Sequence, residues 1–298
     1  NLNNIKNNLN IIKKFSKTPI CPVIKANAYG HGAIKVASHL EDCADCYGVA
    51  CTEEAIELRN SGIDKTPILL MEGIFEVSEL KLIEKYNLIV TVCNSKQLGW
   101  LLGNKFNKPV DVFVKYDSGM GRLGFQGEDF INTINLLEKS EKISQITLMT
   151  HFSSADDLNS TSTNEQISNF DKTLYSKKYS TSLANSAAIM SWSESHREYT
   201  RPGIMLYGSS PFPEKNFLNK LTPAMTLSSV LISIKRFKVG QSIGYGCRYI
   251  CKQDTLIAGD NISIIGSTIS ATVTTDVVDG STKTINLVIE NTYDVEIM

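Results

Sequence analysis

The chain has 298 residues, of which 42% are hydrophobic and 20% charged, and its formal net charge is −1. This is the composition of an ordinary globular protein, long enough for a single barrel or for one large domain and a small one. The balanced charge excludes a nucleic acid or an anionic membrane as an obvious partner, and no apolar run approaches the roughly 20 residues needed to cross a bilayer.

The first fifteen residues predict an amphipathic helix, because Leu2, Ile5, Leu9 and Ile12 recur on one helical face. No small-residue cleavage site follows this segment, so we do not expect a signal peptide. We expect the helix to belong to the folded protein.

Eight short apolar runs rich in β-branched residues follow, and they lack the in–out alternation of a half-exposed sheet. They cover residues 21–25, 46–51, 67–72, 88–93, 110–115, 146–152, 180–186 and 203–208. Stretches with helical periodicity separate them, and the clearest are residues 52–62, 77–86, 95–104, 127–141 and 164–177. Strand and helix alternating eight times predict an α/β fold, a (β/α)8 barrel of the TIM type.

Chemistry in such a barrel gathers at the carboxyl ends of the strands. The residues that follow the predicted strands include Lys25, Lys115, His151 and Ser186. Lys25 alone reads as a surface amine at a strand end or as an amine used for chemistry. Because two amines, an imidazole and a hydroxyl would share one cavity, the second interpretation is favoured.

The character of the sequence changes after about residue 222. The remaining segment is rich in Thr, Ser, Ile and Val, has Gly turns and shows no helical period, which predicts a small β domain. We therefore expect two domains, a barrel over residues 1–222 and a mainly β domain over residues 223–298.

Seven cysteines form an odd set, in which Cys43 and Cys46 have the spacing of a metal or redox pair. No second pair or nearby His completes such a site, so no metal is predicted. Cys46 and Cys51 also bracket an apolar strand, where cysteine serves as a small hydrophobe. Structural thiols are the favoured interpretation, and they fit a reducing, cytoplasmic compartment.

Six motifs follow one another along the chain: PVIKANAYGHGA, VKYDSGMGRLGF, THFSSAD, ANSAAI, RPGIMLYG and SIGYGCRY. In this order and spacing they resemble the alanine racemase family, whose members are pyridoxal 5′-phosphate enzymes built from a barrel and a β domain. The resemblance runs from near residue 2 to about residue 250 and returns weakly at NTYDVEI.

The resemblance implies that Lys25 carries the cofactor as a Schiff base, and that Lys25 and Tyr245 serve opposite faces of the substrate's α-carbon. Two acid/base groups suit a racemase, because protons must reach either face of a planar carbanion. Desolvation and neighbouring cations favour the neutral, nucleophilic form of a lysine. Tyr245 would need nearby positive charge or a hydrogen-bond partner, for which His151 and Arg201 are the family's candidates. Without the resemblance, Tyr245 reads equally well as a core or hairpin aromatic.

By the same resemblance, the cofactor's phosphate is bound by Tyr29, Ser186, the backbone at Gly203 and Ile204, and Tyr293. The ANSAA motif suits this role, because a Ser before a helix offers a hydroxyl and free backbone N–H groups. Gly203 lets the backbone approach closely. Taken alone, Ser186 reads equally well as a helix N-cap.

Arg201 matches the family's arginine that faces the pyridine nitrogen. An arginine keeps its proton, so the ring nitrogen stays largely unprotonated, which suits a racemase better than an aminotransferase. Arg122 matches the arginine near the substrate carboxylate. Lys115 aligns with a lysine that some members carry as a carbamate, and the alternative is an ordinary lysine paired with Asp117. His31 is expected to position its neighbours rather than to act as a base.

The β domain departs from the family pattern. A Gly-Tyr-x-Asp-Gly stretch is expected after TLIA, where the chain continues with GDNISIIG, and the expected Met-Asp pair near ISATVTT is absent. Our interpretation is that loops are missing from this sequence and that TLIAGD is a false junction. If the deletions are real, they affect substrate binding rather than cofactor binding.

We therefore expect a cytoplasmic racemase that interconverts L-alanine and D-alanine and supplies D-alanine for peptidoglycan in the cell wall. A homodimer is implied, since the family combines Lys25 of one subunit with Tyr245 of the other. One alternative is a racemase of the same fold for serine or another amino acid. A second is a non-catalytic protein of the same barrel fold that binds the cofactor, although such relatives typically lack the β domain. A decarboxylase is less expected, because those relatives usually pair the pyridine nitrogen with a carboxylate.

Overall fold

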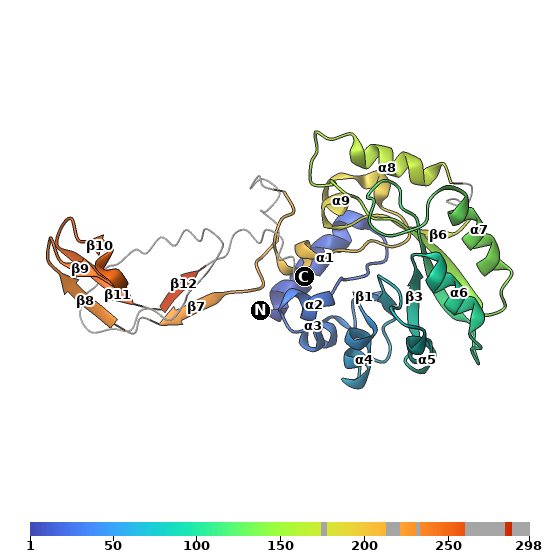
Figure 1. Cartoon of the computed structure of the whole chain (residues 1–298), viewed down its shortest axis with the longest axis horizontal. Coiled ribbons are helices and arrows are strands. Elements are labelled where there is room, and N and C mark those ends of the chain that lie inside the picture. Colours follow the sequence, from blue (N-terminus) through green and yellow to red (C-terminus); the bar gives the residue numbers. More distant parts are fainter. Residues whose placement is uncertain (174–177, 213–220, 231–232, 260–283, 288–298) are drawn as a thin grey trace. The chain divides into compact units, whose positions relative to one another are not determined.

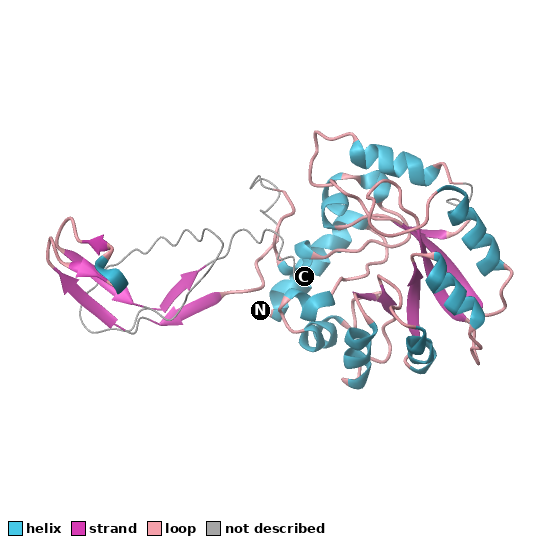
Figure 2. Ribbon diagram, in the orientation of Figure 1, coloured by secondary structure: helices cyan, strands magenta, loops and turns pink. Residues whose placement is uncertain are grey.

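Strands and helices alternate along the first part of the chain in the computed structural model (Figure 1, Figure 2). The structure describes residues 1–173, 178–212, 221–230, 233–259 and 284–287. Residue contacts divide the chain into two units, Asn1–Ala224 and Met225–Met298. The domain boundary expected after residue 222 stays a prediction.

The first unit is built on a six-stranded parallel sheet whose strands neighbour one another in chain order. The strands are β1 (Tyr47–Val49), β2 (Ile68–Leu70), β3 (Leu88–Val92), β4 (Val110–Lys115), β5 (Ile143–Met149) and β6 (Ser180–Ser182). Five of the six have apolar residues on both faces, as expected for strands that are covered on both sides. The register aligns Val90 of β3 with Val112 of β4, so the carboxyl ends of the strands lie along one edge.

Two further segments close this sheet into a barrel. Residues 19–24 pair with β1 through a parallel bridge between Val23 and Gly48. On their other side they pair with residues 199–202 through a bridge between Ile20 and Thr200. Residues 199–202 in turn reach the β6 side, where the Arg201 amide donates to the Ala184 carbonyl at 2.9 Å. Eight chain segments therefore surround the barrel interior, which confirms the predicted barrel.

The eighth strand was predicted in the wrong place. Residues 199–202 occupy the eighth position, whereas Ile204–Tyr207 form a 3-10 helix, η3. Gly208, with a φ of 89°, ends this helix. A short apolar run such as GIMLY fits a strand and a buried helical turn equally well, which is why its sequence misleads.

Helices cover the outside of the sheet, and α4 to α7 lie along its outer face in chain order (Figure 1). The helices are α1 (Leu2–Ser16), α3 (Ala33–Leu40), α4 (Thr52–Asn60), α5 (Leu80–Lys85), α6 (Ser95–Gly103), α7 (Gly127–Glu138), α8 (Ser162–Asp171) and α9 (Ser186–Ser191). Asn1, Asn94 and Asn185 begin α1, α6 and α9, and each side chain accepts a backbone N–H of its helix. A helix forms in each predicted range, although α4, α6, α7 and α8 end one to three residues before the described part of their range does, and the range 77–86 begins with a 3-10 turn, η1 (Val77–Glu79).

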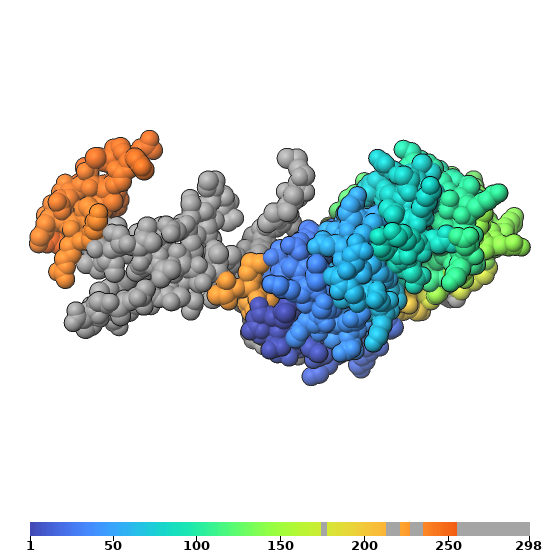
Figure 3. All heavy atoms as spheres, turned by 90° about the horizontal axis from the view of Figure 1, so that it is seen from below, coloured from blue at the N-terminus to red at the C-terminus, as the bar shows by residue number. Residues whose placement is uncertain are grey.

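Helix α1 packs against α3, α9 and η3 with its apolar face, in which Ile5, Leu9 and Ile12 are buried. Asn8 lies on the same buried face. Its amide nitrogen donates to the carbonyls of Leu206 (3.0 Å) and Thr222 (2.8 Å), and its oxygen accepts the Thr222 amide at 2.8 Å. The first unit forms one compact body in the space-filling view (Figure 3).

The second unit contains antiparallel strand pairs. β7 (Leu227–Val230) pairs with β12 (Thr284–Leu287), β8 (Ser233–Phe237) with β11 (Thr255–Gly259), and β9 (Ser242–Ile243) with β10 (Tyr249–Ile250). A 3-10 turn, η5 (Tyr245–Cys247), connects β9 to β10. The predicted β character is confirmed for the described residues, while most of the segment after TLIAGD lies outside them.

The described cysteines are all free, and Cys21 and Cys46 are buried together in the barrel interior with Leu69, Phe113 and Met149. A hydrogen bond with Cys21, together with burial, raises the pKa of the Cys46 thiol well above its ordinary value. Such thiols are unreactive packing groups. Over the described part of the chain, no cluster of three His, Cys, Asp or Glu side chains suits a metal ion, and no helix has the length and apolar character to cross a membrane.

Candidate active site

Lys25 opens a turn of unusual backbone conformation. It was expected at the end of a strand, but the short helix α2 (Lys25–Tyr29) begins at this residue, directly after the barrel segment 19–24. Ala26, Asn27, Ala28 and Tyr29 all have φ between 51° and 55°, so they form a left-handed turn without a glycine. Each non-glycine residue in this region costs roughly 1–2 kcal/mol, so surrounding contacts must hold the turn in place.

Several side chains hold the far end of this turn. The Asn27 side-chain oxygen accepts the Ala33 amide at 2.8 Å. The Nδ1 atom of His31 lies 3.0 Å from the Ala28 carbonyl, and the ring stacks on Tyr207 at 4.5 Å between centroids. Burial lowers the pKa of His31, so the ring is neutral near pH 7. The expectation that His31 positions its neighbours agrees with these contacts.

Lys25 belongs to a group of cationic residues near the carboxyl ends of the strands. Its ion pair with Glu72 has a length of 4.0 Å, and the Lys25 side chain is 39% exposed. Lys115, the last residue of β4, is buried, and burial lowers its pKa to about 8, with Arg201 and Arg122 adding to the effect. The site therefore has a surplus of positive charge, which suits an anionic ligand.

The alternative in which Lys115 pairs with Asp117 is wrong. In the described chain the Asp117 carboxylate accepts the amides of Gly119 (3.1 Å) and Gly121 (2.9 Å) and the side-chain amide of Gln126 (2.9 Å), and no ion pair joins it to Lys115. These bonds fold the loop after β4 that carries the exposed Arg122.

His151 lies two residues after β5, at the same edge of the barrel. Burial and then the charges of Arg201, Lys115, Arg122 and Lys25 hold the pKa of His151 well below its ordinary value. Its imidazole is therefore neutral at physiological pH.

Arg201 is buried at the end of the barrel segment 199–202. Its Nη1 donates to the Ser182 carbonyl at 2.7 Å and to the Ser182 hydroxyl, and its Nη2 donates to the Thr150 carbonyl at 2.6 Å. The Nε–H is buried and has no hydrogen-bond partner among the described residues. Burial lowers the pKa of Arg201 to about 10, so the guanidinium keeps its charge near pH 7. A fixed, charged donor with one unused N–H suits a ligand acceptor such as a ring nitrogen.

Tyr29, Ser186 and Gly203 meet at one place. A Cβ atom built on Gly203 would lie 2.7 Å from the Tyr29 hydroxyl and 3.9 Å from the Ser186 hydroxyl. The Ser186 oxygen accepts the amides of Gly203 (2.9 Å) and Met205 (3.4 Å), so its own O–H is left to donate. The alternative in which Ser186 caps α9 is wrong, because Asn185 is the N-cap and its side chain accepts the Ala188 amide.

The remaining predicted residues are distributed as follows. Ile204 begins η3 directly after Gly203, at the same place as Ser186. Tyr245 belongs to the second unit, where it lies in η5 and its side chain is fully exposed. Tyr293 lies outside the described residues.

Sequence reasoning missed three residues that shape this site. Glu72 lies just after β2, as Lys25 lies just after the barrel segment 19–24. A search for polar residues at the carboxyl ends of the predicted strands could therefore have identified Glu72. Tyr207 lies within RPGIMLYG; its hydroxyl donates to the Val23 carbonyl at 2.9 Å, and its ring lies 5.0 Å from that of Tyr29. Glu54 contacts the left-handed turn, but an acid in the first turn of a helix carries no signal of such a role.

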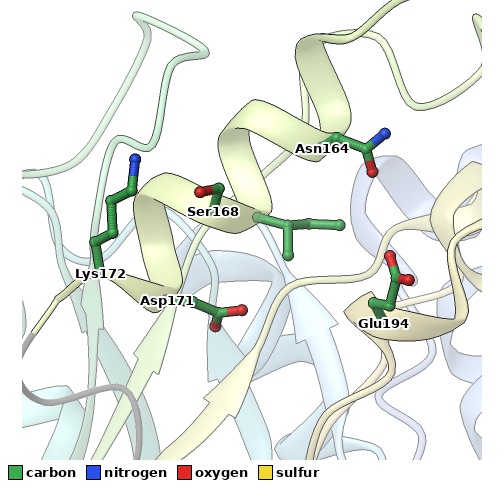
Figure 4. A pocket seen from close by; sticks show the side chains of 6 residues that line it. Asn164, Ser168, Asp171, Lys172 and Glu194 are labelled. Carbon is green, nitrogen blue, oxygen red and sulfur yellow. The ribbon is translucent and has the colours of Figure 1, made fainter.

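A separate hollow lies on the surface along α8 and the 3-10 turn η2 (Ser193–Ser195) (Figure 4). Asn164, Ile167, Ser168, Asp171, Lys172 and Glu194 line it. None of the predicted site residues belongs to this lining, and Asp171 forms an ion pair of 2.9 Å with Arg197. The candidate site is therefore the cationic edge of the barrel.

The fold and this site define an α/β barrel protein with a cation-rich centre for an anionic ligand at the carboxyl ends of its strands. The family model for the N-terminal domain of alanine racemase matches residues 1–211. The chain belongs to the alanine racemase family.

Individual relatives agree with this assignment. Alanine racemase of Pseudomonas syringae pv. syringae is 40% identical over 248 residues, which are 83% of this chain and 69% of that protein. The catabolic alanine racemase of Pseudomonas putida is 39% identical over 254 residues, or 85% of this chain and 71% of that protein. The crystal structure of the biosynthetic alanine racemase from Pseudomonas aeruginosa superposes with a TM-score of 0.81 at 37% identity, covering 86% of this chain and 72% of that one.

Proposed function

We propose that this chain is a pyridoxal-phosphate-dependent amino-acid racemase that interconverts L-alanine and D-alanine. One observation carries the proposal: the amine of Lys25, the hydroxyl of Ser186 and buried Arg201 lie at one cationic edge of the barrel. The Nε–H of Arg201 has no partner among the residues that the structure describes. When bound, the cofactor would supply the electron sink that makes the α-proton of an amino acid removable.

The donor set fits pyridoxal phosphate. The Ser186 hydroxyl, the Tyr29 hydroxyl and the backbone at Gly203 and Ile204 would hold the phosphate, and a close approach is open because Gly203 has no Cβ. Tyr293 is proposed as a further phosphate donor from its place in the family motif. These groups hold and orient the ligand from one end.

Arg201 would hold the cofactor from the other end by donating Nε–H to the ring nitrogen. Because its pKa of about 10 keeps the guanidinium charged, the ring nitrogen would receive a hydrogen bond without taking the proton. The Lys25 amine would bind the cofactor covalently and then take or return the α-proton on one face of the substrate.

Tyr245 of the partner subunit would serve the opposite face in a homodimer. Its full exposure at the β9–β10 turn supports a role at a surface shared with another chain. The neutral imidazole of His151 would be the hydrogen-bond partner of this hydroxyl, and the guanidinium of Arg201 would supply positive charge near it. Acid–base help of this kind contributes about 10²–10⁴-fold to the rate.

Arg122 would bind the substrate carboxylate, since its charged side chain is exposed in the loop after β4. Lys115 is proposed to carry a carbamate that holds Arg122. Only a neutral amine adds carbon dioxide, and the lowered pKa of Lys115, about 8, supports a substantial neutral fraction.

D-alanine made by this reaction in the cytoplasm would enter cell-wall peptidoglycan. The rival functions are a racemase for serine or another amino acid and a non-catalytic cofactor-binding protein.

The proposal is tested by incubating the purified protein in D₂O with L-alanine and, separately, L-serine, beside Lys25→Ala and Tyr245→Phe. We expect deuterium at the α-position and accumulation of D-alanine, with both variants impaired. Cofactor binding without exchange of the α-proton of either amino acid would contradict the proposal and favour a non-catalytic cofactor-binding protein.

A further inference from the structure

Glu54 bridges two segments that are distant in the sequence. One carboxylate oxygen, Oε1, accepts the amide of Ala26 at 2.6 Å, and the other, Oε2, accepts the amide of Ala50 at 2.8 Å. Ala26 opens the left-handed turn directly after Lys25, and Ala50 follows β1. The carboxylate therefore ties the turn to the end of the neighbouring strand.

This use of the side chain is unusual for its place in the helix. Glu54 is the third residue of α4, where a glutamate commonly folds back onto the N-cap residue of its own helix. Here the N-cap is Cys51, and the carboxylate passes it to bind Ala50 and Ala26 instead.

The bond to Ala26 supports the end of the turn that carries the amine. Asn27 and His31 hold the far end, and the Glu54 bond holds the end beside Lys25. A run of non-glycine residues in the left-handed region persists only where surrounding groups over-determine it. A shift of this backbone would move Lys25 at one end of the turn and Tyr29 at the other.

We propose that Glu54 is a positioning residue, which sets the direction of the Lys25 side chain and the place of the Tyr29 hydroxyl by fixing the turn between them. This inference rests on the proposed function, because it assigns Glu54 a part in holding the cofactor. Glu54 itself touches neither cofactor nor substrate in this role.

The test compares Glu54→Gln and Glu54→Ala with Glu53→Gln, a change at the adjacent, exposed acid of the same helix. Glutamine has one acceptor oxygen, so one of the two backbone amides faces an NH₂ group, and alanine leaves both amides unpaired. Circular dichroism of each variant checks that the barrel is folded. The dissociation constant of pyridoxal phosphate is measured by titration of the cofactor-free protein, and kcat and KM are then measured with saturating cofactor.

We expect Glu54→Gln to weaken cofactor binding about tenfold and Glu54→Ala further, with a matching fall in kcat. The KM for alanine should change less than threefold, because Arg122 is untouched, and Glu53→Gln should match the wild type. A lower melting temperature with an unchanged cofactor dissociation constant and an unchanged kcat would show a merely structural role and overturn the inference. Failure of the proposed function is recognised separately, since the wild type would then neither bind the cofactor nor racemise alanine.

Discussion

The hydroxyl of Ser186 accepts the backbone amide of Gly203 at 2.9 Å, which joins the start of α9 to the segment that closes the barrel. Two distant motifs, ANSAAI and RPGIMLYG, thereby meet at the place proposed to bind the phosphate. Because the Ser186 oxygen accepts two amides, its O–H is left to donate to a ligand.

Replacement of Ser186 by alanine removes this donor. A hydrogen bond to a charged group contributes about 1.5–3 kcal/mol, so Ser186→Ala should weaken pyridoxal phosphate binding roughly 10- to 100-fold. Titration of the cofactor-free protein measures this. Ser193→Ala, at an exposed serine in η2, is the control and should bind like the wild type. Equal affinities for both variants would remove Ser186 from the phosphate site.

Gly203→Ala tests the close approach at the same place. The new Cβ would lie 2.7 Å from the Tyr29 hydroxyl, so that hydroxyl must move away. We expect a loss of cofactor affinity of tenfold or more and a fall in the free energy of unfolding of about 1–3 kcal/mol.

Gly99→Ala provides the matched comparison, because a Cβ on Gly99 in α6 meets nothing within 4 Å. It should leave cofactor affinity unchanged and stabilise the helix by roughly 0.5–1 kcal/mol. If Gly203→Ala behaves like Gly99→Ala in cofactor titrations and urea unfolding, the close approach of residue 203 to the Tyr29 hydroxyl is not required for cofactor binding or for stability.

The barrel is predictable from sequence because its strands are covered on both faces, so their apolar runs stand out. The GIMLY run is the exception, because it was predicted as the eighth strand and forms the 3-10 helix η3. Periodicity in five apolar residues does not distinguish a strand from a 3-10 helix, and the hydrogen bonds that place residues 199–202 in the eighth position come from distant segments.

The strand-end rule brings Lys25, Lys115 and His151 to one edge from sequence alone. It does not reveal the conformation that carries Lys25, since KANAY contains no glycine to indicate a left-handed turn. That conformation depends on bonds from Glu54 and Asn27, and only the folded chain brings Glu54 to the turn.

As a free amine, without the proposed carbamate, Lys115 makes the stability of the cofactor-free protein depend on pH. Its pKa falls from 10.5 to about 8 on folding, so between these values the unfolded chain binds more protons than the folded one. Stability contributed by this group therefore rises as the pH increases from about 8 to 10.5. Below pH 8 the buried charge costs about 3 kcal/mol, as a pKa change of this size implies.

Lys115→Met should accordingly raise the free energy of unfolding at pH 7 and flatten its rise up to pH 10.5. Urea unfolding of the cofactor-free proteins across this range measures both effects. Lys81→Met, at an exposed position of α5, should follow the wild-type profile. A Lys115→Met profile that runs parallel to the wild type would mean that this amine titrates normally in the folded barrel.

Asn8 joins the first helix to the backbone that follows the proposed phosphate site. Its buried side chain makes three hydrogen bonds, with the carbonyls of Leu206 and Thr222 and with the Thr222 amide. Asn8→Ala leaves buried backbone groups unpaired, each at about 1–3 kcal/mol, so we expect the free energy of unfolding to fall by roughly 3 kcal/mol. Because Leu206 belongs to η3, which begins beside Gly203, cofactor binding should weaken as well. Asn10→Ala, on the exposed face of α1, is the control and should change neither the free energy of unfolding nor cofactor binding. If the two variants unfold at the same urea concentration, water replaces the hydrogen bonds of Asn8, and η3 is held by its apolar contacts with α1.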